Sequence, residues 1–153
     1  MTKNLSYSHK SAARLAAVQI LYQLELSGGD TLNAVEEFKD YHVNNTIDED
    51  QDKNINWNLA NQLVAGIINH RQELNSLITP ALNKDWKFER LELLIRCILQ
   101  AAVFELITFS DQDSPITIGE YLKITEAFYT EKEAKFVNGV LHKIATQVRE
   151  ESK

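Results

Sequence analysis

The stretch EKEAKFVNGVLHKIA, residues 131–145, combines the spacing of a buried helix face with a dipeptide that usually marks a turn. Asn138-Gly139 is typical of the tight turn between two β-strands. The apolar residues around it nevertheless recur at i, i+4, i+7 and i+11, as in a helix: Val137, Leu141, Ile144 and Val148. A glycine inside a helix costs on the order of 1 kcal/mol relative to alanine. The stretch therefore predicts a helix in which Gly139 has a packing reason, namely the close approach of another helix.

The same helical period runs through the rest of the chain. Residues 8–27 place small and aliphatic side chains on one face at helical spacing: Ala13, Ala16, Ala17, Ile20, Leu21 and Leu24. No alternating strand pattern of useful length is present. We expect helices over these residues: 8–27, a shorter one ending near 42, 55–72, a short one at 74–78, 88–108, 114–129, and one from 131 onward. The sequence thus predicts an all-α chain of about seven helices.

Turn and capping signals separate these helices. The sequence SGGD at residues 27–30 ends the first helix. Ser114 suits an N-cap and Pro115 the first helical position. Thr130 and Glu133 form a T-x-x-E capping box, which predicts the start of the last helix. We expect a polar loop at residues 43–54.

Composition favours a compact protein that needs no covalent staples. The chain has 153 residues, 44% of them apolar, and a single cysteine, Cys97, which we expect to be buried and inert. The most apolar segment, residues 91–109, carries Glu92, Arg96 and Glu105, charges that would be costly in lipid. No secretory signal opens the chain. We therefore expect a cytoplasmic protein without a membrane span.

The motifs of enzymes and metal sites are missing from the sequence. No histidine has metal-ligand spacing with another histidine, cysteine or carboxylate. There is no glycine-rich phosphate loop and no nucleophile elbow. The sequence thus predicts no catalytic residue, no cofactor and no metal.

Charge is unevenly distributed along the chain. The formal net charge is −6, and residues 31–52 carry seven acidic side chains against one lysine. Residues 1–14 carry three basic side chains and no acid, and residues 131–149 carry four basic and two acidic ones. Because salt screens charges beyond about 8–10 Å, local charge matters more than the total. Both ends of the chain are therefore locally basic.

A short stripe on the first helix joins cations with an aromatic ring. Lys10 and Arg14 are i, i+4 neighbours, and Tyr22 lies two turns beyond Arg14; we expect all three to avoid the buried alanine–leucine face. Such a stripe suits RNA, because cations hold phosphates while the ring stacks on an unpaired base. The pattern alone leaves open a solvated face with a half-buried tyrosine.

Four blocks of the sequence resemble the NusB family (N-utilisation substance protein B). LAAVQILYQLELSGG (15–29) is similar to the family's A-x-Q-x-L-Y-x-x-E-L-S-G, and AVFELITF (102–109) to its A-x-Y-E-L. PITIGEYLKITEAFY (115–129) resembles P-x-V-x-I-N-E-x-V-x-x-A-x-x-F, with Gly119 at the asparagine position. KFVNGVLHKIA (135–145) matches K-F-V-N-G-V-L-D-x-x-A at every specified position except His142, and the blocks stand in the family's order.

The resemblance implies two small perpendicular helical bundles. The helix pattern itself divides the chain near residue 83, into an N-terminal subdomain over about 8–82 and a C-terminal one over about 83–150 that share a core. It implies a transcription antitermination factor that binds boxA-type single-stranded RNA together with NusE, a small-subunit ribosomal protein. NusA, NusG and RNA polymerase complete the complex, which resists premature termination, notably in ribosomal RNA operons. The free protein is expected as a monomer or homodimer, without cofactor.

The resemblance also implies RNA-binding positions. The family's arginine-rich start falls on Lys10 to Arg14, where Ser11 and Ala12 carry no charge, and its RNA-stacking tyrosine falls on Tyr22. The loop between the last two helices, near RNA in the family, falls on Phe128 to Lys135. Lys132 stands where many relatives carry an acidic residue. The predicted RNA-binding residues are Lys10, Arg14, Tyr22, Phe128, Lys132, Lys135 and Asn138.

Two other interpretations compete with RNA binding. Similar domains begin ribosomal RNA cytosine methyltransferases, but such an enzyme needs a further cofactor-binding domain, for which 153 residues leave no room. A helical protein–protein adaptor that uses the acidic segment 31–52 and binds no RNA directly is the second.

Overall fold

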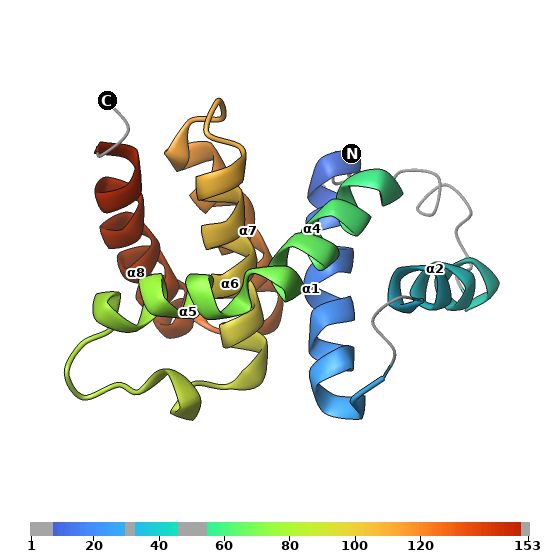
Figure 1. Cartoon of the computed structure of the whole chain (residues 1–153), viewed down its shortest axis with the longest axis horizontal. Coiled ribbons are helices and arrows are strands. Elements are labelled where there is room, and N and C mark those ends of the chain that lie inside the picture. The colour runs from blue at the N-terminus through green and yellow to red at the C-terminus, as the bar shows by residue number, and fades with distance from the viewer. Residues whose placement is uncertain (1–7, 30–32, 46–54, 151–153) are drawn as a thin grey trace. The chain divides into compact units, whose positions relative to one another are not determined.

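The computed structural model describes residues 8–29, 33–45 and 55–150, and these ranges contain helices and no strand. Seven α-helices are found in them: α1 (His9–Ser27), α2 (Ala34–Asn45), α4 (Trp57–Asn69), α5 (Arg71–Ile78), α6 (Leu93–Thr108), α7 (Ser114–Phe128) and α8 (Glu131–Glu150). Two short 3-10 helices, η2 (Thr79–Ala81) and η3 (Phe88–Arg90), link α5 to α6 (Figure 1). The prediction of an all-α chain of about seven helices is confirmed.

Contacts divide the chain into two compact units, Met1–Ala65 and Gly66–Lys153. The division falls inside α4. The boundary expected from the sequence, near residue 83, lies within the second unit, where α5 packs against α6 and α8.

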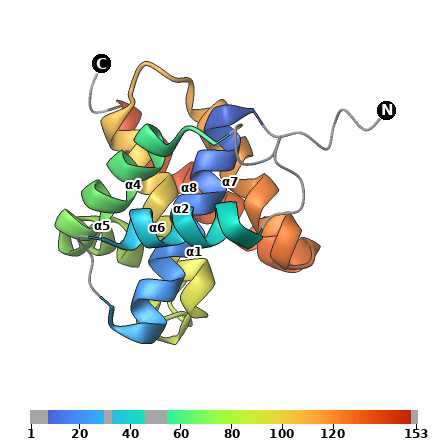
Figure 2. The same ribbon diagram turned by 90° about the vertical axis from the view of Figure 1, so that its right-hand side faces the viewer.

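The first unit is organised around α1. Ser8 caps this helix, its Oγ accepting from the Ser11 N–H at 3.0 Å, and Gly28 ends it with φ 66° while its N–H donates to the Leu24 carbonyl at 2.8 Å. The glycine stop is thus confirmed, because a left-handed φ favours glycine. Helix α2 runs crosswise to α1 (Figure 2). The Asn56 N–H donates to the His9 carbonyl at 3.1 Å, which joins the segment before α4 to the start of α1.

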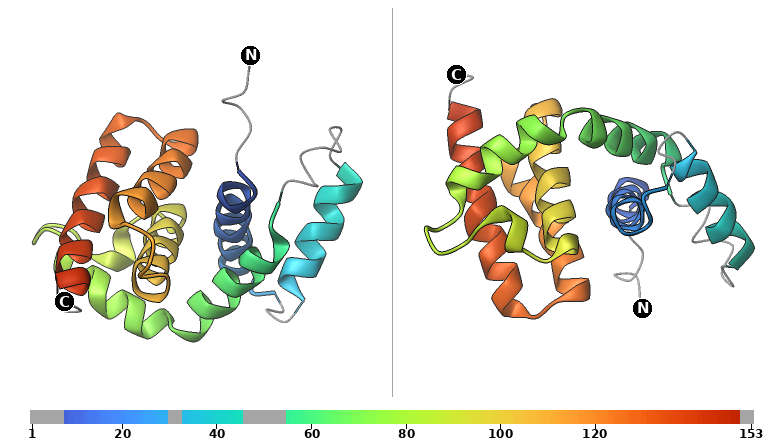
Figure 3. Two further views of the ribbon diagram at one scale, coloured as in Figure 1. Left: turned by 90° about the horizontal axis from the view of Figure 1, so that it is seen from above. Right: turned by 60° about the horizontal axis from the view of Figure 1, so that its bottom comes forward.

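In the second unit α6, α7 and α8 pack against one another, and α5 lies across α6 and α8 (Figure 3). Helix α6 is the central one, with eleven of its residues buried. The last turn of α8 holds the end of α6: Arg149 Nε donates to the Leu106 carbonyl and its Nη1 to the Gln112 carbonyl, both at 3.0 Å. The buried face predicted for 131–148 is confirmed for Val137, Leu141 and Ile144, each fully buried.

Several element ends differ from the prediction. Helix α2 continues to Asn45, so the expected loop at 43–54 begins later; residues 46–54 lie outside the described part of the chain. Helix α6 begins at Leu93, because residues 88–90 form η3. The N-cap of α7 is Asp113 rather than Ser114, so Pro115 is the second helical residue rather than the first.

The packing reason expected for Gly139 is wrong. A Cβ placed on Gly139 would meet no atom within 4 Å, so no helix approaches there. The close approach occurs at Gly66 in α4, where a Cβ would lie 2.2 Å from the Phe104 ring of α6. Gly66 carries no local signal of this, because Phe104 stands far along the sequence.

The structure bears on the single cysteine and on the question of a membrane span. Cys97 is buried, as predicted. Among the described helices, none combines the length and the apolar character that a membrane span requires.

Candidate RNA interface

The predicted RNA-binding residues come from two places in the fold. Lys10, Arg14 and Tyr22 lie on α1 in the first unit, while the other four lie around the α7–α8 turn in the second. The structure places the two groups in different units.

On α1 the predicted residues differ in exposure. Lys10 is exposed and Tyr22 is half-buried, but Arg14 is only 4% exposed. The expectation that Arg14 avoids the buried face is therefore wrong. The reason is that a second row of the helix, Ser11, Arg14, Val18 and Leu21, is buried in addition to the alanine face. Lys10 and Tyr22 remain as the accessible pair.

At the α7–α8 turn the chain bends sharply between two long helices. Tyr129 is extended, with φ −137° and ψ 175°, and α8 starts two residues later. Thr130 then forms the predicted capping box: its N–H donates to Glu133 Oε1 at 3.0 Å, and its hydroxyl donates to the same oxygen. This box fixes the first turn of α8 and thereby the direction in which Lys132 leaves the helix.

The capping contact also changes the electrostatics of this turn. The Thr130 hydroxyl, followed by backbone N–H groups and the nearby Lys132 charge, lowers the pKa of the Glu133 carboxyl below its ordinary value of 4.5. Glu133 is therefore an anion at neutral pH that is held by the cap.

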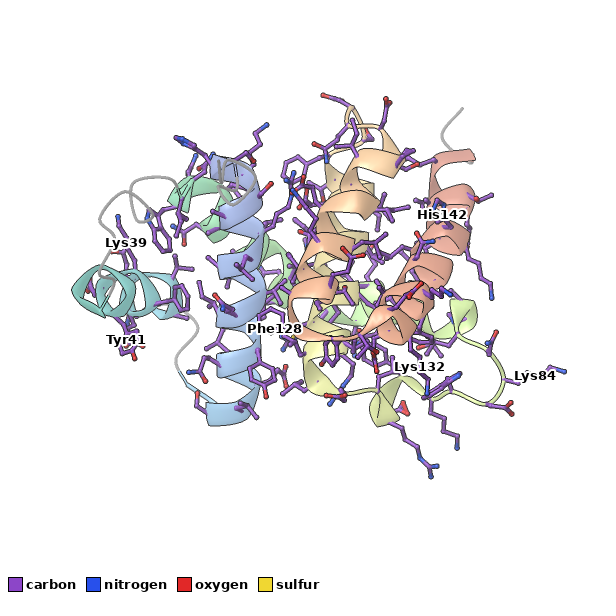
Figure 4. The ribbon with its side chains drawn as sticks, turned by 180° about the vertical axis from the view of Figure 1, so that it is seen from behind. Lys39, Tyr41, Lys84, Phe128, Lys132 and His142 are labelled. Atoms are coloured by element: carbon purple, nitrogen blue, oxygen red, sulfur yellow. The ribbon has the colours of Figure 1, made fainter. Side chains whose placement is uncertain are left out.

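Phe128 and the two lysines of the turn are exposed to solvent. Phe128 is 45% exposed, and Figure 4 shows it at the end of α7, with Lys132 at the start of α8. Lys135 pairs with Glu131 at 3.5 Å, and Asn138 is half-buried. The turn therefore offers an exposed ring and two lysines, groups that bind an anionic strand with unpaired bases.

Comparison with known proteins decides the family. A sequence model described as the NusB family matches residues 11–146. The chain belongs to the NusB family. The transcription antitermination protein NusB of Sinorhizobium medicae is 37% identical over 146 residues, which cover 95% of this chain and 91% of that protein. The protein of the same name from Brucella anthropi is 38% identical, over 94% of this chain and 86% of that one.

Solved NusB structures share the fold. Thermotoga maritima NusB has a TM-score of 0.73 and 29% identity, covering 92% of this chain and 94% of that one. A crystal structure of the antitermination factors NusB and NusE in complex with double-stranded RNA has a TM-score of 0.72 and 27% identity, covering 91% and 97%. Both of these curated relatives are named as transcription antitermination proteins.

One aromatic residue near the turn is absent from the predicted set. Trp86, in the segment between η2 and η3, places its ring 5.6 Å from that of Phe136 on α8. In the sequence, the stretch KDWKF at residues 84–88 indicates this residue as a candidate, because lysines alternate there with aromatic rings. The described residues contain no group of histidine, cysteine and carboxylate side chains that could hold a metal ion.

Proposed function

We propose that this chain is a transcription antitermination factor that binds boxA-type single-stranded RNA together with NusE. In this role it helps RNA polymerase to resist premature termination, notably in ribosomal RNA operons, within a complex that contains NusA and NusG. The observation that carries the proposal is the NusB-family match combined with a relative, similar over 91% of this chain, that was solved with NusE and RNA.

The accessible residues of the candidate interface support direct RNA contact. Lys10 and Lys132 offer charges for phosphates, and Tyr22 and Phe128 offer rings for unpaired bases. Lys135 and Asn138 complete the proposed set on α8. Arg14 is the least supported residue of the proposed set, because its side chain is buried. An Arg14 variant that loses RNA affinity must therefore also be tested for loss of stability by thermal denaturation.

Electrophoretic mobility shift tests the proposal directly. The chain is titrated against a boxA-like single strand and the same sequence as a duplex, with and without NusE, at two salt concentrations. We expect the single strand to shift, more tightly with NusE and less at high salt. A shift in neither case contradicts RNA binding and favours the protein–protein adaptor.

Substitutions then test the assigned residues. Lys10→Ala and Lys132→Ala should weaken binding of all RNA sequences similarly, whereas Tyr22→Ala should lower affinity by roughly 5- to 100-fold, since a stacked base contributes about 1–3 kcal/mol. Lys123 on α7, which pairs with Glu120 at 3.3 Å, provides the control outside the proposed set.

The wider assembly belongs to the same proposal. We place the protein in the cytoplasm, where nascent RNA and RNA polymerase are found, and expect the free chain to be a monomer or a homodimer. Light scattering of the chain alone and with NusE measures both states.

A further inference from the structure

The pair Trp86–Phe136 lies outside the predicted set and has the composition of a base-stacking site. Trp86 is 47% exposed although it is the largest side-chain type, and its ring is tilted by 51° against that of Phe136. Phe136 is half-buried in α8 and so provides a firm support on one side. The remainder of the indole faces solvent.

Backbone hydrogen bonds fix the chain on both sides of Trp86. The Trp86 N–H donates to the Asn83 carbonyl at 2.9 Å, closing a turn. Just after it, η3 is closed by the Arg90 N–H on the Lys87 carbonyl at 2.9 Å, and the Phe88 ring is buried. The ring is thus presented by a short segment fixed at both ends rather than by a long helix.

Exposed lysines lie within four residues of the pair along the chain. Lys84 and Lys87 flank Trp86 in the sequence, and both are exposed. Lys132 stands four residues before Phe136 and so on the same face of α8; Figure 4 shows Lys84 on its segment and Lys132 at the start of the helix. Two acids of this part of α8 are already engaged, Glu131 by Lys135 and Glu133 by the Thr130 cap, while Asp85 and Glu89 stay exposed.

We propose that the Trp86–Phe136 pair, with Lys84, Lys87 and Lys132 around it, binds an unpaired base of RNA by stacking on the indole. This inference rests on the proposed RNA-binding function and adds a second stacking position to it. An exposed ring supported by another ring loses little conformational freedom on stacking, and the lysines bind the phosphates on either side of the base. A protein partner is the competing occupant, since tryptophan is also enriched in protein interfaces.

The two tryptophans of the chain allow a direct optical test. Trp57 contacts the Phe38 ring in the first unit, so Trp57→Phe keeps an aromatic side chain there and leaves Trp86 as the chain's single tryptophan. This variant is titrated with boxA-like single-stranded RNA in the presence and absence of NusE. We expect the Trp86 fluorescence to be quenched on addition of RNA alone.

Substitution of Trp86 separates the possible outcomes. We expect Trp86→Ala to weaken RNA binding roughly 5- to 100-fold and Trp86→Phe to retain most of the affinity, as stacking predicts. Ile116→Ala, at an exposed apolar residue of α7, is the matched control and should leave RNA affinity unchanged.

If the wild-type chain binds RNA while Trp86 neither changes fluorescence nor affects affinity, the stacking site is refuted and the proposed function stands. If Trp86→Ala weakens only NusE binding, the occupant is protein and the proposal is likewise refuted. If the wild-type chain binds no RNA, the proposed function itself fails.

Discussion

Gly66 and Gly139 both lie inside helices, and their surroundings differ. A Cβ at residue 66 would lie within 2.2–2.9 Å of the Phe104 ring, whereas a Cβ at residue 139 would meet nothing within 4 Å. We expect Gly66→Ala to destabilise the fold by about 1–3 kcal/mol, because overpacking outweighs the helix propensity gained. Gly139→Ala should instead stabilise it by up to about 1 kcal/mol. Urea unfolding of both variants measures the two free energies.

A second-site change isolates the cause at Gly66. Phe104→Leu removes ring atoms from the position that the new methyl group would occupy, so the double variant should lose less stability than the two single variants together. Simple additivity, or a Gly66→Ala chain as stable as the wild type, would contradict the close approach.

A buried hydrogen bond between α6 and α7 gives a further prediction at this scale. Tyr121, fully buried, donates its hydroxyl to the carboxylate of Glu105, which is 1% exposed. We expect Tyr121→Phe to lower the free energy of unfolding by about 1–3 kcal/mol, because a buried carboxylate loses a donor. Tyr129→Phe is the control, since its hydroxyl donates at 3.2 Å to the exposed Glu92. Equal losses in the two thermal denaturation curves would disprove the argument.

At the scale of elements, the capping box of α8 makes the start of this helix sensitive to acid. Because the pKa of Glu133 is lowered in the folded chain, its contribution to stability is fully present above the unfolded pKa and is lost as the pH falls through the folded pKa. We expect wild type and Thr130→Ala to differ most in melting temperature at neutral pH, with the difference shrinking below about pH 4.5.

An NMR titration of the Glu133 carboxyl checks this cause. Its midpoint should lie below that of an ordinary glutamate in the wild type and move up in Thr130→Ala, because the hydroxyl is the largest contributor to the shift. Glu131→Gln, one turn before Lys135, keeps the contact between Thr130 and Glu133 and is the control, so the Glu133 midpoint should stay low in it. An unchanged midpoint in Thr130→Ala would show that the cap does not hold the charge.

The elements also show what local sequence can and cannot predict. The period of Val137, Leu141 and Ile144 and the capping pair Thr130 and Glu133 depend on neighbours a few residues away, and both are confirmed. The burial of Arg14 depends on contacts made by a second row of α1, and charged side chains are rarely buried, so the sequence predicts exposure.

The glycines and Trp86 show the same limit for the candidate site. Which glycine meets a ring is decided by Phe104, and whether Trp86 is supported depends on Phe136, both distant in sequence. Composition around residues 84–88 indicates a possible nucleic-acid contact, but only the fold shows that the indole is exposed and backed by a second ring.

For the whole molecule, the formal charge of −6 would suggest repulsion from RNA, and the distribution of charge reverses this expectation. Lys10 belongs to the first unit and Lys132 to the second, and each is proposed to contact a phosphate of the RNA. We therefore expect Lys10→Ala and Lys132→Ala each to reduce the slope of log affinity against log salt by about 0.7, because each lost phosphate contact releases one counterion fewer. The double variant should reduce the slope by about twice that amount.

Lys123→Ala, at the paired lysine of α7, is the control and should leave the slope unchanged. Fluorescence anisotropy of labelled boxA-like RNA at several salt concentrations measures the slopes. If only one of the two lysines changed the slope, the other would not bind phosphate, and a full slope in the double variant would mean that neither lysine does.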